Sequence, residues 1–114
     1  MNIPTETADP PRLDYEAMQR NAGNAVSLLK GLANESRLMI MCVLSEGEIS
    51  VGDLNKRIKL SQSALSQHLA VLRDQDLVQT RRESQTIYYR LRDSAAMNII
   101  EMLHDVYCTS ESVR

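Results

Sequence analysis

The chain has no apolar run near the roughly 18 residues that a membrane helix needs, and it has few cysteines. Its first residues lack the basic-then-apolar order of a secretion signal, so we predict a cytoplasmic protein. Two cysteines, Cys42 and Cys108, are too few for a disulfide framework. In a reducing compartment they are either inert thiols or a redox pair, and composition leaves both alternatives open.

The chain also lacks the residue sets that enzymes need. It has two histidines, two widely separated cysteines and no glycine-rich phosphate loop, so no catalytic constellation with recognisable spacing can be assembled. We therefore predict a protein that is not an enzyme and has no cofactor. A content of 43% hydrophobic and 25% charged residues is typical of a folded domain, which we place at residues 14–108 between flexible tails at 1–13 and 109–114.

The formal net charge of −2 does not suggest a nucleic-acid partner, but the charges are unevenly distributed. Residues 50–92 contain eight basic and four acidic residues, a net charge of +4, which leaves −6 for the rest of the chain. A basic segment between acidic flanks suggests one face for an anionic polymer and another face turned away from it. An ordinary solvated surface would explain the same charges.

Apolar residues at spacings of three and four predict four helices in the first two thirds of the chain. Their ranges are 14–31, 34–44, 51–58 and one that begins at residue 61. The second has apolar residues on so many sides that we expect it to be buried nearly all round, with Cys42 in the core. Each helix begins at a residue suited to cap it: Asp14, Asn34, Ser50 and Ser61.

After Asp76 the apolar spacing changes to two, which predicts a β-hairpin. The strands flank a polar stretch that contains Arg81, Arg82 and Gln85, which we expect at the tip. A last helix, from residue 93 or 94 to Cys108, carries one continuous apolar face.

The third and fourth helices, joined by a short turn, form a predicted helix-turn-helix. Leucines at residues 65, 69 and 72 give the fourth helix a narrow apolar seam, and its first turns carry short polar side chains. Glutamine can bond to adenine, and serine to a base or a phosphate, so these side chains suit a DNA groove. A solvated face is the alternative. The candidate readers are Gln62, Ser63, Ser66 and Gln67.

A hairpin directly after a helix-turn-helix predicts a mainly α (α+β) winged helix-turn-helix of five helices and a two-stranded β-wing. Arg81, Arg82 and Gln85 would reach phosphates or the minor groove, and Arg90 would add a backbone contact. The first and last helices are too apolar on one side for a small monomer to cover, so we expect a homodimer through them. Burial within one chain is the alternative.

Three stretches of the sequence resemble the ArsR/SmtB family of winged-helix repressors: residues 28–38 (LLKGLANESRL), 61–69 (SQSALSQHL) and 88–91 (YYRL). The resemblance extends from about Tyr15 to Cys108. It implies a homodimeric repressor whose partner is double-stranded operator DNA. A protein-interaction module that uses the same fold without touching DNA is the competing function.

Metal sensors of this family often carry a Cys-x-Cys motif at the start of the third helix, because neighbouring thiolates hold a soft cation. This chain has Ser50–Asp53 (SVGD) there, so that site is absent. The last helix offers one histidine, His104, beside acidic residues and Cys108, and we interpret this group as a solvated polar face. We expect His68 to pack or to contact a phosphate, and we expect no metal site.

The two cysteines resemble the pair in the dithiol branch of the family, the sulfide-responsive and redox-responsive repressors. The resemblance implies that an oxidant or sulfane sulfur bridges Cys42 and Cys108 through a disulfide or polysulfide and so releases DNA. An apolar neighbourhood raises the pKa of Cys42, so we expect the more accessible Cys108 to be attacked first. The alternatives are structurally inert cysteines, a metal-responsive repressor, and an activator that displaces a silencer.

Overall fold

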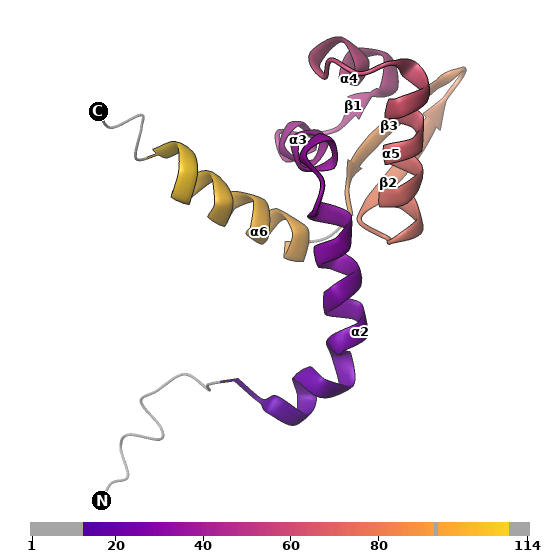
Figure 1. Cartoon of the computed structure of the whole chain (residues 1–114). Coiled ribbons are helices and arrows are strands. Elements are labelled where there is room, and N and C mark those ends of the chain that lie inside the picture. Colours follow the sequence, from indigo (N-terminus) through magenta and orange to yellow (C-terminus); the bar gives the residue numbers. More distant parts are fainter. Residues whose placement is uncertain (1–12, 93, 110–114) are drawn as a thin grey trace, which may run out of the picture.

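The computed structural model describes residues 13–92 and 94–109. Both predicted tails therefore lie almost entirely outside the described residues, as does Asp93, one of the two starts predicted for the last helix. Within these ranges the chain forms five α-helices and a three-stranded antiparallel sheet, the arrangement of a winged helix (Figure 1). None of these helices is both long and apolar enough to cross a membrane.

Four helices begin directly after the caps that the sequence predicted. In each, the cap side chain accepts a hydrogen bond from the backbone N–H three residues further on, which satisfies one of the unpaired donors of the first turn. The helices are α2 (Tyr15–Leu32), α3 (Glu35–Leu44), α4 (Val51–Arg57) and α5 (Gln62–Asp74). The predicted helix-turn-helix is therefore confirmed as α4 and α5.

The sheet contains the predicted two-stranded wing and one short strand more. β2 (Val78–Glu83) and β3 (Thr86–Leu91) form the hairpin, and Ser84 in its turn has a φ of 57°. β1 (Ile49–Ser50) pairs with the other edge of β3. Ser50 has an extended backbone because it caps α4, and this conformation allows the segment before α4 to join the sheet. A strand of two residues leaves no alternating pattern in the sequence.

The last helix begins at the second of its two predicted positions. α6 (Ser94–His104) continues into η1 (Asp105–Thr109), a turn of π-helix that contains Cys108. The predicted helix through Cys108 is confirmed, with a wider final turn than an α-helix has.

The core is centred on α3, whose Ile40, Met41 and Leu44 are fully buried. Two expectations for this helix need correction. Met39 is 52% exposed, so α3 is not buried nearly all round. Cys42 is half-buried at the edge of the core rather than inside it. In both cases the reason is that neighbouring elements cover only part of the circumference of α3.

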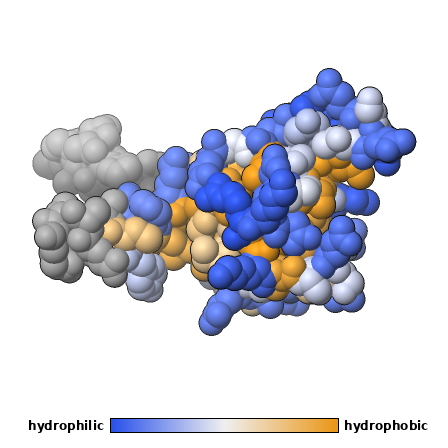
Figure 2. All heavy atoms as spheres, turned by 90° about the horizontal axis from the view of Figure 1, so that it is seen from above, coloured by the Kyte–Doolittle hydropathy of each residue, from blue (hydrophilic) through white to orange (hydrophobic). Residues whose placement is uncertain are grey.

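The helices α2 and α6 extend away from this body in different directions (Figure 1). Apolar side chains along both remain exposed: Leu29 is 57% exposed on α2 and Met102 is 55% exposed on α6, and Tyr107 in η1 is 68% exposed. Apolar atoms are also visible among polar ones on the face shown in Figure 2. The chain by itself therefore leaves apolar surface uncovered on its two projecting helices.

Candidate nucleic-acid interface and thiol pocket

The second helix of the helix-turn-helix, α5, is called the recognition helix below. It has one buried face and one exposed face. Its leucine seam, residues 65, 69 and 72, is buried against the core, as the sequence predicted. The four candidate readers all lie on the exposed side, near the start of the helix: Gln62, Ser63, Ser66 and Gln67. The Ser61 hydroxyl accepts from the backbone N–H of Ala64 at 3.1 Å and so fixes this first turn. The polar face of α5 is thus accessible to a large partner.

His68, a further candidate on α5, faces into the molecule instead. It is half-buried, and its Nδ1 lies 3.5 Å from Nη1 of Arg37 on α3. The same guanidinium donates to two carbonyl oxygens at the end of α2, those of Gly31 at 2.8 Å and Lys30 at 3.0 Å. Arg37 therefore ties the end of α2 to the recognition helix, and the position of His68 fits the packing role among the two that we expected.

In the wing, Arg81 is held by partners within the chain and lies in the third residue pair from the turn rather than at the tip. Its guanidinium donates to both carboxylate oxygens of Glu48, at 3.1 and 2.8 Å, and to Glu83 at 2.8 Å. It also lies 4.4 Å from the ring centroid of Tyr88. The hydrogen bond from Arg81 lowers the pKa of Glu48, and the charges of Arg81 and Arg90 add to that effect. The charge of Arg81 is therefore paired with Glu48 and Glu83 within the chain.

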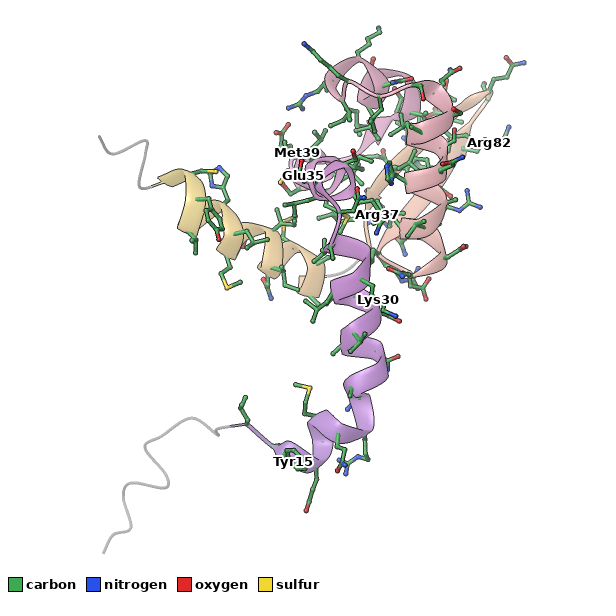
Figure 3. All side chains as sticks on the ribbon, viewed as in Figure 1. Tyr15, Lys30, Glu35, Arg37, Met39 and Arg82 are labelled. Atoms are coloured by element: carbon green, nitrogen blue, oxygen red, sulfur yellow. The ribbon has the colours of Figure 1, made fainter. Side chains whose placement is uncertain are left out.

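Arg82 lies on the opposite face of the wing, because side chains alternate along a strand. Its register partner is Ile87, and its face continues into the buried Val78. The recognition helix packs against the base of this face, where Arg73 of α5 donates to the Tyr89 hydroxyl at 3.5 Å. Arg82 therefore lies on the same side of the sheet as α5, toward the outer end of the wing (Figure 3).

The two other candidates of the wing are also exposed. Gln85 lies in the turn between β2 and β3. Arg90 is the register partner of Gln79, so it lies on the face of Arg81. The wing thus presents Arg82 and Gln85 near its outer end, whereas Arg90 lies nearer its base.

Cys42 lines a pocket of about 320 Å³ between α3 and α6. The wall beside Cys42 comes from the residues that follow α3, and the opposite wall comes from α6 and the start of η1. The other lining residues are Ser45, Glu46, Ile100, Glu101, His104 and Asp105. Cys108 lies one turn beyond His104 and is exposed. Neither cysteine is in a disulfide.

Burial raises the pKa of the Cys42 thiol, and the thiol of Cys108 and the carboxylate of Glu46 raise it further. Cys108 is thus one of the groups that oppose ionisation of Cys42. Cys42 consequently has less thiolate at neutral pH than an ordinary cysteine has. Cys108 is the more accessible of the two.

The described residues hold no group of three or more histidine, cysteine or acidic side chains arranged to bind a metal ion. At the position where metal sensors of the resembled family carry thiolates, Ser50 instead uses its hydroxyl to accept from the backbone N–H of Asp53 at 3.1 Å.

Sequence reasoning missed the acidic partners of two arginines. Glu48 pairs with Arg81 across 33 residues of sequence, and Glu46 pairs with Arg57 across 11. Neither separation is a helical or strand period, so no pattern joins the partners. The only local signal is that Glu46 and Glu48 flank Gly47, whose φ of 141° marks a sharp turn after α3.

An exposed polar helix face above a buried leucine seam, followed directly by an arginine-bearing wing, defines a winged helix-turn-helix regulatory protein. Residues 34–80 match the family described as bacterial regulatory protein, arsR family. The chain is 51% identical to the transcriptional activator HlyU of Vibrio cholerae over 96 residues, which are 84% of this chain and 89% of that protein. The chain belongs to the arsR family of bacterial regulatory proteins, and it is a transcriptional regulator of that family.

Two further similarities concern repressors. The chain is 42% identical over 101 residues to the biofilm growth-associated repressor of Xylella fastidiosa, with 89% of each chain covered. The crystal structure of the transcriptional repressor BigR from Xylella fastidiosa matches with a TM-score of 0.78 at 40% identity, over 85% of this chain and 99% of that one. The same fold thus carries proteins named as an activator and as repressors.

Proposed function

We propose that the protein is a homodimeric repressor that binds double-stranded operator DNA in the cytoplasm and releases it when Cys42 and Cys108 become bridged. The observation that carries this proposal is that Cys42 lines one wall of the interhelical pocket, and that Cys108 lies one turn beyond His104, which lines the opposite wall. The Cys108 thiol is also one cause of the raised pKa of Cys42. The similarity to repressors over most of the chain supports the part of the proposal that the bound protein represses transcription.

The dimer would form through the uncovered apolar faces of α2 and α6. Val26 and Leu29 lie three residues apart on α2 and are both exposed, as are Met102 on α6 and Tyr107 in η1. A second copy of this chain would cover these faces, because homodimers usually pair the same surface patch around a two-fold axis. Two copies would then present two α5 helices to successive major grooves of a two-fold operator.

In this arrangement the exposed side chains of α5 contact the base edges of the DNA, and the wing contacts its phosphate backbone. Gln62, Ser63, Ser66 and Gln67 are the proposed contacts to base edges and adjacent phosphates. Arg82, on the side of the recognition helix, is the main phosphate contact of the wing, with Gln85 and Arg90 beside it. Arg81 contributes indirectly, since Glu48 and Glu83 hold it against the wing.

An organic persulfide, RSSH, is sufficient to form the bridge. The thiolate of Cys108 attacks the terminal sulfur, a Cys108 persulfide forms, and the thiolate RS⁻ leaves. The thiolate of Cys42 then attacks the Cys108 sulfur, the disulfide forms, and hydrosulfide leaves. The two protons of the dithiol and the proton of the persulfide end on RSH and H₂S, and the dithiol loses two electrons to the sulfane sulfur. A polysulfide bridge would require further persulfide.

Bridging would draw α6 toward α3 and change the angle between the two subunits. The two α5 helices would then no longer match successive grooves, which lowers the affinity for the operator.

The experiment uses intact protein and a duplex that the protein selects from random sequences. The protein is treated with an organic persulfide, sulfide, polysulfide or peroxide, each product is identified by intact mass, and operator binding of each product is measured. We expect the bridged product to bind more weakly and the Cys42→Ser and Cys108→Ser variants to stay bound. Release of those variants by persulfide would show that the switch lies elsewhere.

A second candidate function is activation by displacement of a silencing protein from shared DNA. The observation that favours it is the 51% identity to a protein named as a transcriptional activator. A reporter gene under the selected operator distinguishes the two functions: deletion of the regulator raises expression if it represses and lowers expression if it displaces a silencer.

A further inference from the structure

Glu46 joins the thiol pocket to the helix-turn-helix. It lines the pocket beside Cys42, and its carboxylate accepts two hydrogen bonds from the guanidinium of Arg57, at 2.6 and 3.3 Å. Arg57 is the last residue of α4, the first helix of the helix-turn-helix. The hydrogen bond from Arg57 lowers the pKa of Glu46, so the carboxylate is ionised at neutral pH.

On the pocket side, hydrogen bonds connect the residues from Cys42 to Glu46. The Ser45 hydroxyl donates to the carbonyl oxygen of Cys42 at 2.6 Å, and the backbone N–H of Glu46 donates to the carbonyl of Val43 at 3.0 Å. A displacement of Cys42 toward α6 would therefore carry Glu46 with it.

On the side of the helix-turn-helix, Arg57 is four residues before Ser61, the cap of the recognition helix. The backbone N–H of Ile58 donates to Leu54 and that of Leu60 to Ile58, so the turn follows the end of α4 closely. Beside the ion pair lies a second hollow of about 220 Å³, which Val43, Glu46 and Arg57 help to line. Val43 and Ile58 are buried in the same core, and at the surface beside them the charge-assisted pair adds a polar link between the residue after α3 and the last residue of α4.

We infer that Glu46 and Arg57 are positioning residues that transmit bridging of the thiols to the recognition helix, an inference that rests on the proposed function. In the unbridged protein the pair fixes the end of α4 for DNA binding. Bridging draws Cys42 toward α6, moves Glu46 away from Arg57, and shifts the turn that begins α5.

The test measures one ratio, the operator Kd of the bridged protein divided by that of the unbridged protein, with both states verified by intact mass. In Glu46→Gln the unbridged form should bind about two- to fivefold more weakly and the bridged form unchanged, so the ratio falls by the same factor. Glu101→Gln is the matched control, because Glu101 lines the same pocket from α6 and loses the same charge. Its ratio should equal that of the wild type.

The charge-swapped double variant, Glu46→Arg with Arg57→Glu, should recover most of the lost ratio, which a role in packing alone would not produce. A direct phosphate contact by Arg57 would overturn the inference: Arg57→Gln would then weaken both forms equally and flatten the salt dependence, and Glu46→Gln would change nothing. If wild-type protein keeps its affinity on bridging, the proposed function itself fails. If the wild type loses affinity and Glu46→Gln keeps the full ratio, only the transmitting role fails.

Discussion

In the body formed by α3, α4, α5 and the sheet, apolar side chains of adjacent elements bury one another, whereas along α2 and α6 many similar side chains face solvent. Leu65 and Leu72 on the recognition helix are fully buried, but Leu29 on α2 and Met102 on α6 are more than half exposed. Burial of one such side chain stabilises a fold by roughly 1.5–3 kcal/mol. The body obtains that stabilisation within one chain, and the projecting helices would obtain it only from a partner.

A regulator of this kind must place its recognition helix relative to its wing, and it must set the distance between the recognition helices of two subunits. The two regions serve these two requirements separately. The body places the recognition helix relative to the wing through contacts that do not depend on protein concentration. The projecting helices would set the spacing between two recognition helices, and that spacing depends on association. A change in one region should therefore alter DNA binding in a different way from a change in the other.

The largest expected effect comes from the projecting region. Val26→Asp combined with Leu29→Asp places two charges on the uncovered face of α2, so we expect a monomer that binds the operator about 100-fold more weakly, because the second half-site no longer adds to the first. Sedimentation and operator binding measure the two effects. Met39→Asp is the matched control, since Met39 is exposed and apolar but lies on α3 of the body. A dimeric double variant would assign the interface to another surface.

A smaller effect is expected in the body, where the two neighbouring wing arginines should differ. Arg82→Gln should weaken operator binding several-fold at moderate salt and reduce the salt slope by about one, because a phosphate contact is lost. Arg81→Gln should leave the slope unchanged, since Glu48 and Glu83 already hold that guanidinium. Filter binding from low to high salt gives both slopes. Equal losses of slope would show that DNA displaces the carboxylates from Arg81.

The sequence predicts those features whose causes are local. Ser50 and Ser61 cap helices through a backbone donor three residues away, and the alternation from Val78 to Leu91 sets the hairpin. The pair between Glu48 and Arg81 was not predictable, because its members meet only after β1 has joined β3. The partial exposure of Cys42 was missed for a similar reason: apolar spacing within α3 does not show which neighbours will cover the helix.

The last and smallest predicted effect concerns the two cysteines, one in the body and one on a projecting helix. Burial, the Cys108 thiol and Glu46 all raise the pKa of Cys42. In Cys108→Ser the neighbouring thiolate no longer opposes ionisation, so the pKa of Cys42 should fall part of the way toward its ordinary value while burial keeps it raised. At a pH below that pKa, more thiolate is then present.

We therefore expect iodoacetamide to alkylate Cys42 up to about twofold faster in Cys108→Ser than in the wild type near pH 8, with the difference disappearing at a higher pH at which Cys42 is fully ionised in both proteins. Mass spectrometry of the Cys42 peptide gives the rate across the pH series. Glu101→Gln serves as the control, because Glu101 is not among the causes of the raised pKa. Identical pH profiles for the Cys108→Ser variant and the wild type would mean that in solution η1 holds its thiol too far from α3 for a bridge, and the projecting helix would then take no part in sensing.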